Sequence, residues 1–246
     1  MKKIILTFAI VVAISTNLAA TTWGPAKHKC PVCGKTETYY EIMSYGGYIY
    51  QWPSKYQYVF WPLTDTHSIY CCPHCFFATY MWDFDSIPNA KKDTLQSYLQ
   101  TVKLHGKFKS YLNIPVTTRL SIAEKVYQII GRDEEFWCKF YRVAGYNFEI
   151  EKQFDKAFDF RLKSLYFAKE MIRDSLRKDQ QKENYIIAAG MSYFTNQKDS
   201  TSKYFSIASS LKYANNKMKD ENAAGLDEYL TDLIVQYKEF IKQENK

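Results

Sequence analysis

Two short motifs, Cys30-Pro31-Val32-Cys33-Gly34 and Cys72-Pro73-His74-Cys75-Phe76, decide how the amino-terminal third of this 246-residue chain folds. In each motif two residues separate two thiols, so one tight turn aims both sulfurs at a single ion. Two such turns, called knuckles below, complete a tetrahedral shell of four thiolates. That shell suits zinc and leaves no open position for catalysis. We therefore predict one structural Zn²⁺ bound by Cys30, Cys33, Cys72 and Cys75.

The residues between the knuckles predict a small sheet. Gly34 fits a turn that needs a positive φ, whereas Phe76 predicts a looser second turn. The 38 residues between Cys33 and Cys72 exceed the roughly 15–20 of short zinc ribbons. Ten of the 23 residues from 39 to 61 are aromatic, which fits a thin core of large rings or an exposed platform for a sugar or peptide. Four segments are rich in β-branched and aromatic residues and predict strands: 36–43, 48–52, 57–61 and 67–71.

The second knuckle also supports a different interpretation. Cys72-Pro73-His74-Cys75 is the tetrapeptide found in periplasmic disulfide oxidases of the thioredoxin superfamily, where a reactive Cys at a helix start exchanges disulfides. In an oxidising compartment each knuckle could instead close as a disulfide. However, helices rather than a hairpin follow Pro115, and the first knuckle would have no role. A thiol–disulfide oxidoreductase using Cys72 and Cys75 is therefore the alternative function.

Two further cysteines lie outside the knuckles. Cys138 follows Trp137 in a helical stretch and is most simply a small buried hydrophobic residue. A disulfide between Cys71 and Cys138 is the other reading of this pair.

The amino terminus has the pattern of a secretory signal peptide. Lys2 and Lys3 precede an apolar run over 4–14, and Leu18-Ala19-Ala20 supplies small residues for cleavage after Ala20. We therefore expect an exported protein, periplasmic or secreted. Removal of the leader would leave 31 basic and 26 acidic residues, scattered rather than blocked, so nucleic acid is not an expected partner. No later segment reaches transmembrane length, and no catalytic motif is found, which favours a non-catalytic protein.

The carboxyl-terminal half predicts stacked helices. Residues 91–112 form a predicted connecting helix, and helical periodicity continues from Thr117 to the end. Buried stripes are predicted at Leu226, Tyr229, Leu230, Leu233, Ile234, Tyr237, Phe240 and Ile241, and at Phe154, Ala157, Phe158, Leu165, Ala168 and Ile172. Tyr141-x2-Ala144-Gly145-x2-Phe148 recurs as Ile186-x2-Ala189-Gly190-x2-Tyr193, which places the two glycines 45 residues apart. With Ala157 and Ser202 at the small position of each second helix, the pattern resembles tetratricopeptide repeats; a plain helical bundle is the alternative.

This register predicts a groove for a protein or peptide partner. With Gly145 and Gly190 at the packing position, one face of each first helix would line the groove. The residues on those faces are Lys139, Arg142 and Tyr146 in the first unit and Asn184, Ile187 and Met191 in the second. The two cations could hold a carboxylate, with Tyr146 and Met191 supplying apolar contact. An ordinary solvated helix face is the competing interpretation.

The paired knuckles, Phe60-Trp61-Pro62-Leu63, Ser68-Ile69-Tyr70 and the helical tail together resemble the bacterial domain-of-unknown-function family 2225. The resemblance covers most of residues 28–215. It implies a zinc-ribbon-like head with tetratricopeptide-like helices, and it implies no activity.

The predicted fold class is α+β, with a zinc-ribbon-like β head followed by an all-α helical array. The expected organisation is a signal peptide at 1–20, the β domain at 21–88, a connecting helix and linker at 89–116, and the tetratricopeptide-like domain at 117–246.

Overall fold

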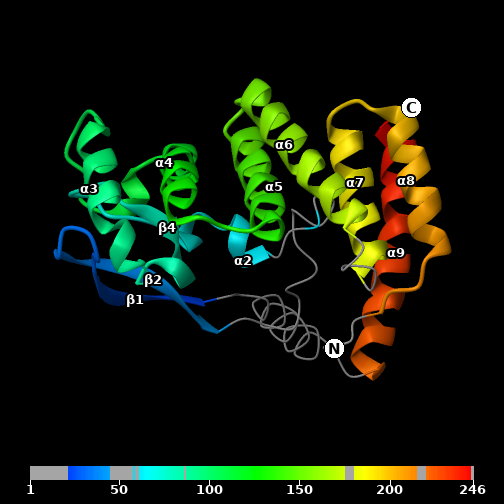
Figure 1. Ribbon diagram of the computed structural model, residues 1–246, viewed down its shortest axis with the longest axis horizontal. Coiled ribbons are helices and arrows are strands. Elements are labelled where there is room, and N and C mark those ends of the chain that lie inside the picture. Colours follow the sequence, from blue (N-terminus) through cyan, green and yellow to red (C-terminus); the bar gives the residue numbers. More distant parts are fainter. Residues whose placement is uncertain are drawn as a thin grey trace, which may run out of the picture.

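The computed structural model describes residues 22–44, 58, 61–85, 87–174, 180–214 and 220–244. The predicted signal peptide and the predicted strand at 48–52 lie outside these residues, as does most of the predicted strand at 57–61. The α+β class is confirmed: a small β region comes first and a mostly helical region follows. Figure 1 shows the β region beside α3 and α4 at one end, followed by α5, α6 and α7 in order, with α8 and α9 together at the other end.

The β region consists of two antiparallel ribbons, each closed by a knuckle. β1 (Thr22–Lys29) pairs with β2 (Thr36–Ser44), and β3 (Ile69–Cys71) pairs with β4 (Ala78–Tyr80). The predicted strands at 36–43 and 67–71 correspond to β2 and to a short 3₁₀ turn followed by β3. The short helix α2 (Trp61–Thr64) starts where the predicted strand 57–61 ends.

Seven longer helices follow the ribbons in the described part of the chain. The predicted connecting helix is shorter than expected, because α3 (Lys92–Thr101) ends ten residues before a 3₁₀ turn at Tyr111–Asn113. Gly131 ends α4 with a positive φ of 86°, and the Asp133 side chain caps the next helix by accepting from the Phe136 amide. The remaining helices are α4 (Val116–Ile130), α5 (Glu134–Ile150), α6 (Phe154–Arg173), α7 (Gln181–Phe194), α8 (Lys198–Ser210) and α9 (Asp220–Glu244).

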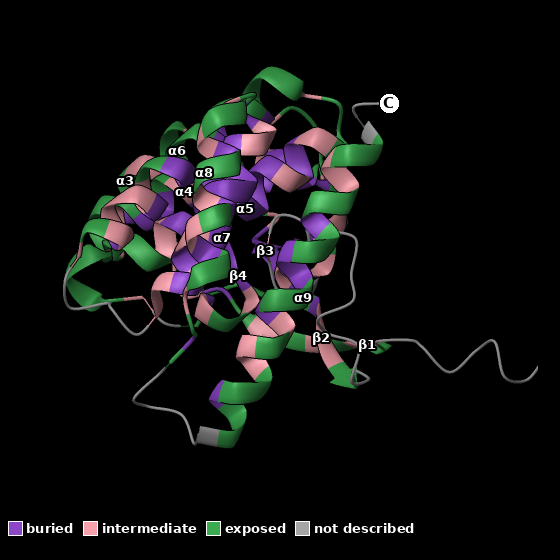
Figure 2. Ribbon diagram, turned by 90° about the vertical axis from the view of Figure 1, so that its right-hand side faces the viewer, coloured by how far each residue is buried: buried purple, intermediate pink, exposed green. Residues whose placement is uncertain are grey.

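One apolar core joins the ribbons to the first helices, and we call it the amino-terminal core. It runs from Cys30 and Tyr39 in the ribbons to Leu120 in α4, Phe140 in α5 and Phe160 in α6. The predicted boundary between residues 116 and 117 therefore falls inside a continuous core. Figure 2 shows β3 and β4 as buried, whereas β1 and β2 are mostly intermediate or exposed.

Buried polar contacts reinforce this junction between α4 and the ribbons. The Arg119 guanidinium is almost fully buried and donates from Nη1 to the carbonyls of Ile69 (2.5 Å) and Thr66 (2.7 Å). The Tyr127 hydroxyl accepts from the Tyr80 amide at 2.8 Å. These bonds satisfy backbone groups at the edges of β3 and β4 that would otherwise be buried without partners.

The carboxyl-terminal core is separate and is formed by α7, α8 and α9. Its centre contains Ile186, Phe205, Leu230 and Tyr237, all nearly inaccessible to solvent. The predicted buried stripe of α9 is confirmed at Leu230, Leu233, Ile234 and Tyr237. In α6 the predicted stripe is wrong at two positions, because Phe154 and Phe158 are exposed while Ala157, Leu165 and Ala168 are buried.

The helix pairs α5–α6 and α7–α8 repeat the same turn, but the register of the repeat differs by one residue from the sequence-based prediction. The α5–α6 and α7–α8 turns make the same bonds: Gln153 N donates to Phe148 O, and Gln197 N donates to Ser192 O, both at 2.8 Å. Each turn also holds one residue at positive φ, Lys152 (58°) and Asn196 (59°). These turn residues are 44 apart rather than 45, a period longer than the roughly 34 of tetratricopeptide repeats.

The corrected register changes which residues are equivalent. Ala157 corresponds to Thr201 rather than Ser202, and both Ala157 and Thr201 are buried. Gly145 corresponds to Ala189. A Cβ at Gly145 would lie 2.9 Å from Cγ of Arg161, which shows how closely α5 and α6 approach there. The expected close packing of the first helix pair is therefore present.

Candidate metal centre

The two knuckles are the same turn built twice. In the first, the Cys30 amide donates to Lys35 O (2.8 Å) and the Gly34 amide donates to Cys30 O (2.9 Å). In the second, the Cys72 amide donates to Phe77 O (2.9 Å) and the Phe76 amide to Cys72 O (2.8 Å). The spacing Cys-x-x-Cys thus fixes one backbone loop at the end of each ribbon.

The prediction of a looser second turn is wrong, because both turns have the same backbone conformation. Phe76 has a φ of 62°, close to the 74° of Gly34, although non-glycine residues rarely adopt this region. The Phe76 ring packs edge-on against Phe108, with 6.2 Å between centroids. We infer that this contact offsets part of the backbone strain, which costs about 1–2 kcal/mol.

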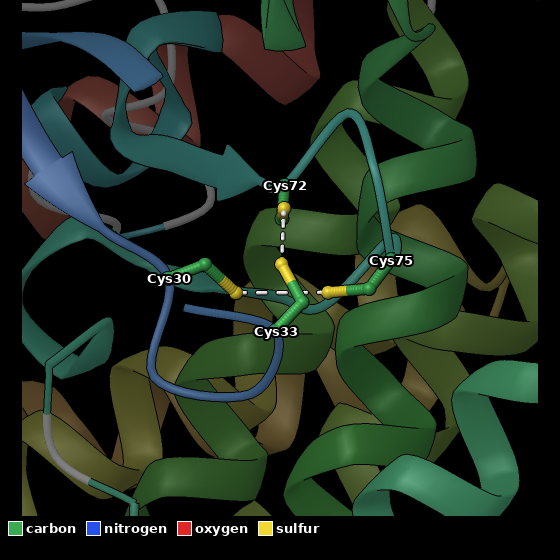
Figure 3. A group of neighbouring side chains, drawn as sticks. All are labelled: Cys30, Cys33, Cys72 and Cys75. Atoms are coloured by element: carbon green, nitrogen blue, oxygen red, sulfur yellow. Dashed lines mark hydrogen bonds between the residues drawn. The ribbon is translucent and has the colours of Figure 1, made fainter. Parts of the chain in front are cut away.

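The four knuckle sulfurs converge on one point (Figure 3). All four Sγ atoms lie within 4.8 Å of one another, and the pairs Cys30–Cys75 and Cys33–Cys72 are 3.6 Å apart. Four sulfurs at the usual Zn–S distance of about 2.3 Å in a tetrahedron would be about 3.8 Å apart. The spacing of the four sulfurs is therefore close to that of a four-cysteine metal site, and thiolate is the ligand type that such a site uses.

The electrostatics of the cluster also favour a cation. Hydrogen bonds from Cys30 and Cys75 lower the pKa of the Cys72 thiol despite its burial. The pKa of Cys75 is raised, because its thiol donates to Cys30 and Cys72 and because it is partly buried. Ionisation of one thiol in the cluster therefore raises the pKa of its neighbours. A divalent cation removes this conflict by neutralising several thiolates at once.

The surroundings of the cluster are asymmetric. Cys30 and Cys72 are buried, Cys75 is half-buried and Cys33 is exposed. On the buried side the Tyr39 ring stacks on Tyr70, with 4.5 Å between centroids. Burial and the nearby Cys72 and Cys30 sulfurs raise the pKa of Tyr39, and its buried hydroxyl has no hydrogen-bond partner in the described part of the chain. An O–H donor of this kind suits a thiolate-rich site.

The nearby histidines are engaged with carboxylates and do not join the sulfurs. His28 Nε2 lies 2.8 Å from Glu41, and His74 Nε2 lies 2.6 Å from Glu37. Among the described residues, the only group of three or more metal-ligating side chains close enough to share one ion consists of the four knuckle cysteines. Both histidines thus connect the knuckle regions to β2 through its glutamates.

The geometry around Cys72 differs from that of a thioredoxin-like active site. Cys72 to Cys75 form the turn between β3 and β4, whereas the oxidoreductase interpretation needs Cys72 at the start of a helix. The first knuckle lies opposite the second and contributes half of the sulfurs. Both features favour metal binding over thiol–disulfide exchange.

Cys71 and Cys138 occupy different parts of the molecule. Cys71 is buried in the amino-terminal core, while Cys138 packs in a small cluster with Leu165, Ala168 and Ile187. Both are free thiols. The Cys138 sulfur accepts from Arg142 Nη1 at 2.9 Å, so it acts as a polar partner as well as a small buried side chain.

The residues predicted to line the groove divide into two groups. Lys139 is exposed and Tyr146 is half-buried, whereas Arg142, Asn184, Ile187 and Met191 are almost fully buried within the array. The one-residue shift in register changes the face predicted for the second unit, but the corrected positions Ile186 and Gly190 are buried as well. Each of its three predicted positions is turned by about 100° from the face that the first unit presents. The true equivalents of Lys139, Arg142 and Tyr146 are Glu183, Ile186 and Gly190.

An aromatic residue from the head lies against this face. Tyr58 contacts both the carboxyl-terminal core and the cluster around Cys138, and its hydroxyl hydrogen-bonds to Glu183. Burial raises the pKa of Glu183, while the Tyr58 hydroxyl and the nearby Arg142 act in the opposite direction. Glu183 was not among the predicted groove residues, because the predicted register placed Asn184 on this face.

The chain matches no family model, and comparison with curated proteins and with solved structures finds no match either. Within the described residues, no helix is both long and apolar enough to cross a membrane.

Proposed function

We propose that this chain is an exported, non-catalytic protein whose head is stabilised by one Zn²⁺ and whose helical array binds a protein or peptide partner. The observation that carries the proposal is the convergence of four sulfurs from two equivalent turns. Four protein ligands close the coordination shell, so the ion would hold two ribbons together without activating water or substrate. The signal-like leader and the resemblance to family 2225 support export and the two-part organisation as parts of this proposal.

The partner-binding part of the proposal rests on the inner face of the array. Tyr58 of the chain itself packs on this face beside the Glu183 carboxylate, and this contact supports an aromatic residue as the anchor of a partner segment. Lys139 is exposed near Arg142 and Glu183, and both cations contribute to the electrostatics of Glu183. A partner segment that carries an aromatic residue and a hydrogen-bond donor would fit this chemistry.

Metal content and free thiols, measured together on protein purified without reductant, test the central part of the proposal. We expect one zinc per chain and four cysteines that become reactive only after a chelator is added. Absence of metal with two disulfides among Cys30, Cys33, Cys72 and Cys75 would contradict it. Insulin reduction that is lost in Cys72→Ser with the fold intact would favour the oxidoreductase alternative.

A further inference from the structure

The exposed apolar side chains of this protein are concentrated on one helix. Eight large hydrophobic residues are exposed in the described part of the chain, and four of them lie on α6: Phe154 (61%), Phe158 (36%), Leu162 (38%) and Tyr166 (59%). A fifth, Ile150 (63%), ends the preceding helix. Apolar residues scattered singly over a surface are normal, but a contiguous run on one element marks an interaction surface.

The four α6 residues form a continuous stripe. They are four positions apart, so each lies about one turn beyond the previous one and the stripe is about 18 Å long. The same helix buries Phe160, Ser164 and Ala168 on its other side, so packing among the described residues does not account for the stripe. A row of side chains at i, i+4, i+8 and i+12 is the ridge by which two helices commonly pack against each other.

The charges at the two ends of the stripe are opposite. Asp155 is exposed beside Phe154 in the first turn of α6, and the half-buried Lys169 lies one turn beyond Tyr166 on the same face. In the described part of the chain, neither Asp155 nor Lys169 forms an ion pair. Of the other exposed charges on α6, Asp159 lies one turn beyond Asp155, Lys156 lies over the Phe148 ring, and Lys163 pairs with Glu124. The stripe is therefore flanked by carboxylates in its amino-terminal half and by Lys169 at its carboxyl-terminal end.

We propose that this stripe binds the same stripe of a second copy of the chain, with the two α6 helices antiparallel about a two-fold axis. Phe158 then faces Leu162 of the second copy, and Phe154 faces Tyr166. Asp155 comes within reach of Lys169 of the second copy at both ends, and the helix dipoles oppose each other favourably. Interdigitating ridges of this type cross at about −50°.

The charge pattern selects a second copy over a lipid surface. A two-fold axis turns one acidic end and one basic end into two complementary pairs. A membrane would instead place Asp155 against anionic headgroups. A contact made by one helix per copy is smaller than the roughly 1,200–2,000 Å² of stable interfaces, so the dimer is weak, with a dissociation constant of about 10–500 μM. This inference is independent of the proposed zinc site and partner groove.

Analytical ultracentrifugation of the protein, expressed from its whole coding sequence and purified with zinc, tests the proposal. Between about 5 and 500 μM the average mass should rise from one chain toward two. Leu162→Glu should weaken association at least tenfold, because a two-fold axis places the substitution in the interface twice. Val235→Glu is the matched control, since Val235 is also exposed (51%) but lies on α9. The control should dimerise like the unmodified protein, and circular dichroism should show an unchanged fold for both variants.

A charge-swap experiment tests the antiparallel arrangement. Asp155→Lys alone and Lys169→Asp alone should each weaken association several-fold, because like charges then meet at both ends. Mixing the two variants should restore it, because both ends of the mixed dimer are complementary. A protein that stays monomeric at 500 μM would overturn the proposal, as would association that survives Leu162→Glu. Binding to anionic vesicles that is lost in Leu162→Glu, with no dimer in solution, would assign the stripe to a membrane instead.

Discussion

The amino-terminal and carboxyl-terminal cores contain similar aromatic and aliphatic side chains but depend on different stabilising features. In the first, two short ribbons bury Tyr39 and Tyr70 beneath four converging sulfurs, and α4 is joined to them through Arg119. In the second, α7, α8 and α9 bury continuous apolar faces without any cysteine. Short ribbons have too little apolar surface to be stable alone, whereas long amphipathic helices do not need a metal.

This difference predicts that removing one ligand acts on one core only. Cys72→Ala should unfold the ribbons, because structural zinc typically supplies about 10–16 kcal/mol of apparent binding free energy. Near-ultraviolet circular dichroism and zinc content should both collapse. Cys71→Ala is the matched control in the adjacent position. Cys71 is equally buried but lies outside the cluster, so its loss should cost only about 1–2 kcal/mol and leave zinc bound. Equal effects of the two substitutions would contradict the metal site.

The second-largest effect is expected at the junction between α4 and the ribbons. Arg119→Met removes a buried guanidinium that donates to the carbonyls of Ile69, Thr66 and Ile114. Each charge-assisted bond contributes about 1.5–3 kcal/mol, and burial of the apolar Met side chain recovers part of the loss, so the free energy of unfolding should fall by about 3–5 kcal/mol. Urea unfolding followed by tryptophan fluorescence measures this loss. A loss below 1 kcal/mol would show that α4 does not depend on these bonds.

Tyr58 offers a smaller test, because it connects the head to the array. Tyr58→Phe removes only the hydroxyl that bonds to Glu183, and we expect a loss of about 1 kcal/mol in the free energy of unfolding. Tyr58→Ala removes the ring as well, at a cost of about 3 kcal/mol. If both variants unfold like the unmodified protein in urea, Tyr58 makes no stabilising contact with the array.

The smallest effect concerns pH and is confined to the carboxyl-terminal core. Burial opposes ionisation of Asp227, but hydrogen bonds from Lys182 and the Tyr213 amide lower its pKa. A lowered folded-state pKa contributes stability that is present at neutral pH and is lost as pH falls below about 4. Helicity of α7–α9 should therefore weaken in that range. Asp227→Asn should remove this pH dependence, and a midpoint unchanged by the substitution would rule out the pair as its source.

The sequence was sufficient for the features that depend on spacing. The four-cysteine cluster followed from two Cys-x-x-Cys turns, and the central part of the α9 stripe followed from helical periodicity. β1 was missed because Gly24 and Pro25 interrupt a strand signal, and their place in the structure depends on pairing with β2. The positive φ of Phe76 could not be predicted, because phenylalanine rarely adopts this conformation.

The register error has a physical cause of the same kind. Gly145 and Gly190 look equivalent, but the structural repeat is set by the α5–α6 and α7–α8 turns. In these turns, Lys152 and Asn196 both have a positive φ, although their side chains are chemically different. A shift of one residue rotates every side chain of a helix by about 100°, so Asn184, Ile187 and Met191 do not lie on the face that corresponds to Lys139, Arg142 and Tyr146. Likewise, the exposure of Phe154 and Phe158 depends on which helices are neighbours of α6.

Residue-resolved hydrogen exchange of the zinc-loaded chain, before and after addition of a chelator, tests the contrast between the two cores most directly. We expect metal removal to abolish protection in β1–β4 and to lower it in α4, which depends on Ile69 and Tyr80 for its buried bonds. Protection of Ile186, Leu230 and Tyr237 in α7 and α9 should stay unchanged. Protection that is unaffected everywhere would show that no metal stabilises the ribbons, and uniform loss through α9 would show that the molecule has one core rather than two.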